Sequence, residues 1–129
     1  MMRIVLIVCA VAVGASPYCA HAQNTGNELL QNCQAALSMP GTPEGHSQMV
    51  EAERMKGMNC FGYVRGVWDT FSLYEAAGYP PLACIPQEAT VGELVRVIVK
   101  YLNDHPNQLH EPDNVSLFKA LKEAYPCKK

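Results

Sequence analysis

One polar stretch holds the side chains that are best suited to chemistry. His105, His110 and Glu111 lie close together in the sequence, with Asp104 just before them. Two histidines and a carboxylate can bind zinc, but helical zinc motifs place the histidines four residues apart, whereas these are five apart with a proline between them. A solvated surface loop explains this composition better. We therefore predict no catalytic residue, no metal site and no cofactor, and the chain is not expected to be an enzyme.

Cysteine supplies the other reactive groups. Two of the six cysteines lie in the first 22 residues, which leaves Cys33, Cys60, Cys84 and Cys127. An even number in a short exported chain is typical of disulfides, and no thiolate nucleophile would then remain. Zinc is the alternative, but no two of these cysteines lie within four residues of each other, as structural zinc sites require. Three pairings are possible, and the expected order of the helices favours Cys33–Cys60 and Cys84–Cys127.

The first 22 residues have the pattern of a cleaved secretion signal. A positive residue precedes the apolar run Ile4–Val13, and Ala20-His21-Ala22 has the small-x-small form of a cleavage site. The run is too short to span a bilayer. Cys19 follows the bulky Tyr18, unlike a lipid-attachment cysteine, so no membrane anchor is expected. We predict cleavage after Ala22 and export of residues 23–129 to the periplasm as a single domain.

The mature domain is small and weakly acidic. Loss of Arg3 reduces ten basic residues to nine, against twelve acidic ones, so the net charge is −3 with neutral histidines. This balance gives no basis for expecting nucleic acid or an anionic membrane as a partner. The 107 residues that remain of 129 after removal of 22 are enough for one compact core.

The longest helical pattern runs from about Ser47 to Ala77. Its apolar residues recur at spacings of four and three, which places them on one helix face: Cys60, Val64, Val67, Phe71 and Tyr74. Gly62 and Gly66 each cost about 1 kcal/mol relative to alanine inside a helix. Close approach of another helix should offset that cost. We expect this neighbour within the chain, and a homodimer contact is the alternative. The methionines at 49, 55 and 58 are expected to fill the core.

Three further helices are expected around the central one. Capping-box patterns, Thr25 with Glu28 and Thr90 with Glu93, open the first and the third helix of the chain. The last helix runs from about Pro112 to Ala124, with an expected apolar face of Val115, Phe118, Leu121 and Tyr125. A polar loop, residues 103–111, connects the third helix to the last one. No alternating strand pattern is present, so the predicted fold class is all-α, a small disulfide-stapled bundle of about four helices.

Four segments, taken in order, resemble the Rap/Tai family of immunity proteins: Cys60-Phe-Gly-Tyr-Val-Arg-Gly-Val, Cys84-Ile-Pro, Val97-Ile-Val-Lys-Tyr-Leu-Asn-Asp-His-Pro106 and Ala120-Leu-Lys-Glu-Ala-Tyr-Pro-Cys127. The resemblance spans Cys33 to Cys127. It implies an exported, all-helical, disulfide-linked protein that is often dimeric. Family members bind and block peptidoglycan amidases that the type VI secretion system delivers, so the expected partner is a secreted cell-wall amidase.

The resemblance also implies how inhibition works, by a loop that enters the amidase cleft. The first candidate is the loop 103–111, with expected partner-binding residues Asp104, His105, Asn107, Gln108, His110 and Glu111. The second is Gly78–Leu82. Two alternatives stay open. The same scaffold could serve a periplasmic binding or stress-response helper of the chaperone type, or an enzyme could use the histidines of the first loop.

Overall fold

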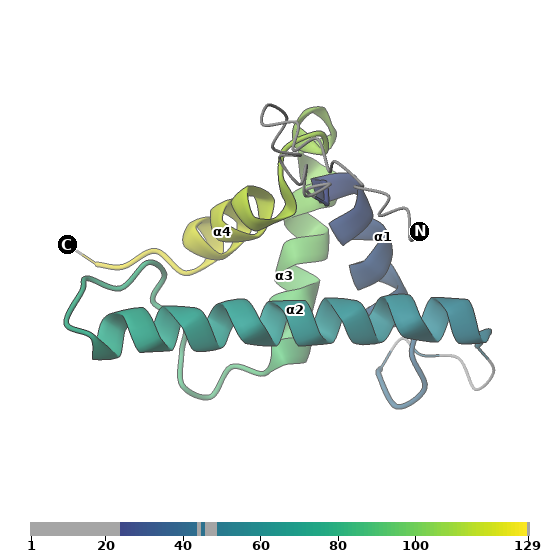
Figure 1. Ribbon diagram of the computed structural model, residues 1–129, viewed down its shortest axis with the longest axis horizontal. Coiled ribbons are helices and arrows are strands. Elements are labelled where there is room, and N and C mark those ends of the chain that lie inside the picture. Colours follow the sequence, from purple (N-terminus) through teal and green to yellow (C-terminus); the bar gives the residue numbers. More distant parts are fainter. Residues whose placement is uncertain (1–23, 44, 46–48, 129) are drawn as a thin grey trace, which may run out of the picture.

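The structure, a computed structural model, describes residues 24–43, 45 and 49–128. The predicted secretion signal lies outside these residues. The described chain holds helices α1 (Gly26–Leu37), α2 (Glu51–Ala76), α3 (Val91–Asp104) and α4 (Asp113–Ala124), with a 3-10 helix η1 (Pro106–Gln108) before α4. Figure 1 shows α2 as a long rod along one side of the molecule, with α1 and α3 crossing it steeply. The predicted all-α bundle of about four helices is confirmed.

Both predicted capping boxes open their helices. The Thr25 N–H donates to Glu28 Oε2 at 2.9 Å, and the Glu28 N–H donates to Thr25 Oγ1 at 3.4 Å. At α3 the Thr90 N–H donates to Glu93 Oε2 at 2.6 Å, and the Glu93 N–H donates to Thr90 Oγ1 at 3.2 Å. These bonds satisfy backbone donors that have no partner inside the helix. The bonds from Thr90 also lower the pKa of Glu93.

Helix α2 is shorter at its start than the sequence pattern predicts. It begins at Glu51, and its N-cap, Val50, makes no side-chain hydrogen bond to the helix. Ser47, where the predicted helix begins, lies outside the described residues. At the other end Gly78 has φ +88° and its N–H donates to the Glu75 carbonyl at 2.9 Å. Glycine adopts this left-handed conformation without the steric cost of a Cβ, so α2 ends where predicted.

The core lies between α1, α3, α4 and the middle of α2. Its largest fully buried apolar side chains are Val64, Leu94, Val95, Ile98, Leu102, Leu117 and Leu121. Each buried leucine or isoleucine contributes about 1.5–3 kcal/mol relative to an exposed one. No helix in the described ranges is both long and apolar enough to cross a membrane.

Both favoured disulfides are present. Cys33–Cys60 joins α1 to α2 across 27 residues of sequence, and its two cysteines are buried. Cys84–Cys127 joins the connection after α2 to the tail after α4, across 43 residues, and Cys84 is exposed. In the chain-entropy model these links lower the conformational entropy of the unfolded chain, and they stabilise the fold by about 3.6 and about 4.0 kcal/mol. Such amounts matter for a domain of this size, and the pairs indicate folding in an oxidising compartment.

Helix α4 is rotated relative to its predicted face. Ser116, Leu117, Ala120 and Leu121 are buried, whereas Val115 is 38% exposed. The reason lies at the start of the helix, where the Asp113 N–H donates to the Asn24 carbonyl at 2.9 Å and Pro112 forms a bridge with Thr25. These backbone contacts fix the rotation of α4, and they turn Leu117 inward in place of Val115.

The expected close helix approach occurs at a different glycine. A Cβ at Gly57 would lie 3.0 Å from Ala36 Cα, so α1 packs against α2 at this point. Nothing in the described chain would lie within 4 Å of a Cβ at Gly62 or Gly66. The expectation of an intramolecular neighbour at these two glycines is therefore wrong. Met55 and Met58, expected in the core, are 56% and 57% exposed.

Candidate partner-binding loop

The polar loop lies at the C-terminal end of α3, beside the start of α1 (Figure 1). Helix α3 ends at Asp104. The next residue, His105, precedes Pro106, and the residue before a proline is disfavoured in helical geometry. Helix η1 and a turn then lead to Pro112 and the start of α4. Of the six expected partner-binding residues, the structure leaves Asp104, Asn107 and His110 exposed. The other three, His105, Gln108 and Glu111, are half-buried.

Backbone hydrogen bonds tie this loop to α1. The Gly26 N–H donates to the Glu111 carbonyl at 2.8 Å, and the Asn27 N–H donates to the Leu109 carbonyl at 2.9 Å. The first N–H groups of a helix have no partner inside it, so the loop carbonyls satisfy donors that would otherwise need water. A Cβ at Gly26 would lie 3.3 Å from the Leu109 carbonyl oxygen. The close approach therefore depends on glycine, and the loop is fixed along its backbone.

His105 is held in place by a hydrogen bond and by a ring stack, both with Tyr101. Its Nδ1 lies 2.8 Å from the Tyr101 carbonyl oxygen, and its ring stacks on the Tyr101 ring with centroids 4.1 Å apart. A carbonyl oxygen can only accept, so Nδ1 carries the proton and donates it. Burial raises the pKa of Tyr101, which stays protonated and donates its hydroxyl to Gln108 Oε1 at 3.2 Å.

Lys119 of α4 holds the rest of the loop. Its ammonium group donates to both Glu111 carboxylate oxygens, at 2.6 and 2.7 Å, and to Gln108 Oε1 at 3.2 Å. Charge-assisted bonds of this kind are stronger than neutral ones. Glu111 and Gln108 therefore point inward as supports. Lys119 and Tyr101 support the candidate loop, and the sequence did not indicate either of them.

The loop thus has two sets of side chains with different roles. The inner set, His105, Gln108 and Glu111, braces the loop against α3 and α4. The outer set is exposed: Asp104, Asn107 and His110. Within the outer set Asp104 forms an ion pair with Lys100 one turn earlier on α3. Among the described residues, no three histidine, cysteine or acidic side chains lie close enough together to hold a metal ion.

The second candidate loop, Gly78–Leu82, lies beyond the C-terminal end of α2, in the first part of the connection to α3 (Figure 1). Tyr79 is exposed and stacks on Tyr74, with ring centroids 4.6 Å apart. The cysteine bridge Cys84–Cys127 pins the following residues. The Gly78 and Tyr79 N–H groups donate to carbonyls at the end of α2, but the described residues give this loop no side-chain network like that around Lys119.

A disulfide-linked helical scaffold that presents a braced polar loop is suited to binding another protein. The model of the Rap1a immunity proteins matches residues 25–127, and the chain belongs to this family. The resemblance that the four sequence segments indicate is therefore confirmed. Family membership implies a role in binding a protein effector. Neither the curated proteins nor the solved structures include a match to this chain.

Proposed function

We propose that this chain is an exported, periplasmic immunity protein that binds and sterically blocks a peptidoglycan amidase effector of the type VI secretion system. The loop 103–111 enters the amidase cleft and presents Asp104, Asn107 and His110 to it. One observation carries this proposal. The loop is ordered by backbone bonds to α1 and by the contacts of Lys119, and its outer side chains are left exposed.

A braced loop is an efficient inhibitor because its ordering does not have to occur on binding. Immobilising a side chain at an interface costs about 0.5–1.5 kcal/mol, and ordering a flexible loop costs more. Here His105, Gln108 and Glu111 already have fixed partners within the fold. The favourable contacts of the outer side chains with the amidase are then not offset by the cost of ordering the loop.

The proposal is tested by affinity capture. The tagged, oxidised domain of residues 23–129 is incubated with lysate of the producing cells, and bound proteins are identified by mass spectrometry. We expect one stoichiometric amidase. A variant with Asp104→Ala, Asn107→Ala and His110→Ala should retain much less of it. The matched control, Gln34→Ala, Glu88→Ala and Glu123→Ala, changes three exposed residues outside the loop and should capture it fully. Many substoichiometric clients, equal in all three proteins, would favour the stress-response helper.

We further propose that the functional unit is a homodimer formed through α2. One face of this helix is exposed and combines apolar side chains with the two glycines: Met55, Met58, Gly62, Gly66 and Leu73. Within the described chain no close packing offsets the helix-propensity cost of the two glycines, and packing against a second copy could offset it. Sedimentation analysis should show a dimer that Gly66→Leu weakens. A monomer at all concentrations would contradict this part.

A further inference from the structure

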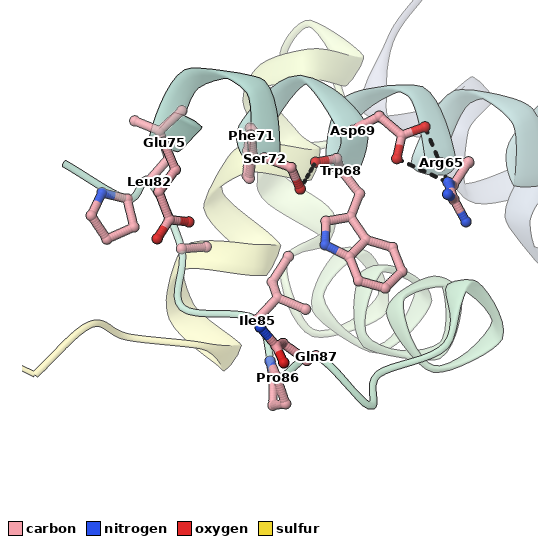
Figure 2. A pocket seen from close by; sticks show the side chains of 12 residues that line it. Arg65, Trp68, Asp69, Phe71, Ser72, Glu75, Leu82, Ile85, Pro86 and Gln87 are labelled. Carbon is pink, nitrogen blue, oxygen red and sulfur yellow. Dashed lines mark hydrogen bonds and ion pairs between the residues drawn. The ribbon is translucent and has the colours of Figure 1, made fainter. Parts of the chain in front are cut away.

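The C-terminal half of α2 and the connection to α3 enclose a cleft of about 340 Å³ (Figure 2). This volume lies at the lower end of the range of about 300–1,000 Å³ that ligand sites occupy. Trp68 and Ile85 lie together along the cleft, and Glu75 and Leu82 lie together at one end of it. The cleft adjoins the start of α3, whereas the polar loop follows its end. No residue of the loop 103–111 lines the cleft, so the two surfaces are separate.

The cleft is preformed. Its outer wall contains two prolines, Pro81 and Pro86, which restrict the backbone. Between them Cys84 is bonded to Cys127, and the Cys84 N–H donates to the Tyr125 carbonyl at 2.9 Å. Its inner wall is a regular helix. A ligand would therefore meet a surface that does not need to be ordered first.

The charge of the cleft is negative and uncompensated at the Glu75 end. Arg65 is already engaged, since its Nε donates to the two carboxylate oxygens of Asp69 at 3.0 and 3.1 Å. No partner is present for the Glu75 carboxylate in the described part of the chain. The last turn of α2 also holds no basic residue, so the free carbonyls of the helix end add negative partial charge there. This end of the cleft is complementary to a cation.

The remainder of the cleft offers apolar surface and hydrogen-bonding groups. Phe71, Leu82 and Ile85 provide the apolar part. Trp68 is half-buried and adds a large ring, over which the Arg65 guanidinium lies 5.8 Å from the centroid. The Gln87 amide has no partner among the described residues and can pair with a peptide backbone. These groups fit an aliphatic side chain followed by a basic one.

We infer that this cleft is a docking site for an extended segment of another protein that carries a lysine or arginine next to an aliphatic residue. The basic side chain pairs with Glu75, and the aliphatic side chain packs on Trp68 and Ile85. The site is separate from the loop 103–111, and the inference does not depend on which enzyme that loop blocks.

Trp68 is the only tryptophan of the chain, so its fluorescence reports on this cleft alone. The probes are the peptides acetyl-Gly-Leu-Lys-Leu-Gly-amide and its glutamate and norleucine analogues. The lysine peptide should shift the emission saturably and bind more tightly than both analogues. Glu75→Gln should weaken the lysine peptide by about threefold, the size expected for an exposed ion pair, and leave the norleucine peptide unchanged.

The matched control is Glu88→Gln, which removes the same charge from the nearby connection to α3 but outside the lining of the cleft. It should leave the affinity for the lysine peptide unchanged. Circular dichroism verifies that both variants keep their helices, as expected for exposed positions. Equal affinity for the three peptides, an equal effect of the two substitutions, or no saturable change up to millimolar peptide would overturn the inference.

Discussion

Lys119 shows how a single residue decides the shape of the proposed inhibitory surface. It bonds the Glu111 carboxylate and the Gln108 amide, and so it links the end of the loop to α4. The sequence identified the loop and its polar character, because composition and Pro106 are local signals. It did not separate inner from outer side chains. That separation depends on which groups Lys119 and Tyr101 reach in three dimensions, and no spacing rule for loops provides it.

Replacement of Lys119 should loosen the loop without removing any outer side chain. We expect Lys119→Met to lower the free energy of unfolding by about 1 kcal/mol, since it leaves a half-buried carboxylate without its partner. Inhibition should weaken as well, because the loop must then be ordered on binding. Urea unfolding and an inhibition titration measure the two effects. Lys122→Met is the control, because Lys122 is exposed and its ammonium group lies over the Phe118 ring, 5.5 Å from the centroid, away from the loop. Equal effects of the two variants would refute the bracing role.

Ser116 is the one buried side chain of the described residues whose polar atom has no hydrogen-bond partner. Its residue exposure is 1%. A buried hydroxyl without a partner loses its bonds to water and gains nothing in return. Ser116→Ala should therefore raise the free energy of unfolding by about 1 kcal/mol. Thermal and urea unfolding test this expectation, and a loss of stability would show that the hydroxyl is bonded in solution.

At the scale of helices, predictions that depend on neighbours in sequence are correct, whereas predictions of how the helices pack on one another are not. Both capping boxes start their helices where the sequence predicts, since each involves residues only three apart. The rotation of α4 was mispredicted because it follows from contacts between Pro112 and Thr25, far apart in sequence. The role of the glycines in α2 was also misassigned. Glycine spacing indicates that close packing is possible, but it does not say which glycine meets a neighbour.

The glycines of α2 give an experiment with opposite expected signs. Gly57→Ala places a methyl group 3.0 Å from Ala36 Cα and 2.7 Å from Met39 Sδ. This overpacking should destabilise the domain by about 1–3 kcal/mol. Gly62→Ala meets nothing within 4 Å and should stabilise the monomer by about 1 kcal/mol through helix propensity. Unfolding of both variants at low protein concentration measures the difference, and equal signs would contradict the packing described.

At the scale of the whole molecule, two disulfides hold different parts of the fold. Cys33–Cys60 lies inside the core, whereas Cys84–Cys127 lies at the surface near the cleft. The sequence predicted which cysteines pair, since the helix order makes neighbours of the right elements. It could not predict this difference in exposure, which depends on how α1 packs on α2.

Mild reduction should distinguish the two bridges. Thiol–disulfide exchange requires access to a sulfur atom, so dithiothreitol without denaturant should open Cys84–Cys127 first. Alkylation followed by mass spectrometry should find Cys84 and Cys127 modified while Cys33 and Cys60 stay bonded. The core helices should persist by circular dichroism at that stage. Simultaneous reduction of both bridges would mean that the core opens as readily as the surface.

The central claim is that the braced loop blocks the amidase, and an inhibition titration tests it most directly. Release of peptidoglycan fragments by the captured amidase is measured against added domain of residues 23–129. The account predicts complete inhibition at one equivalent, competition with substrate, and loss of inhibition in the variant with Asp104→Ala, Asn107→Ala and His110→Ala. A complex that still cleaves peptidoglycan, or full inhibition by that variant, would contradict it.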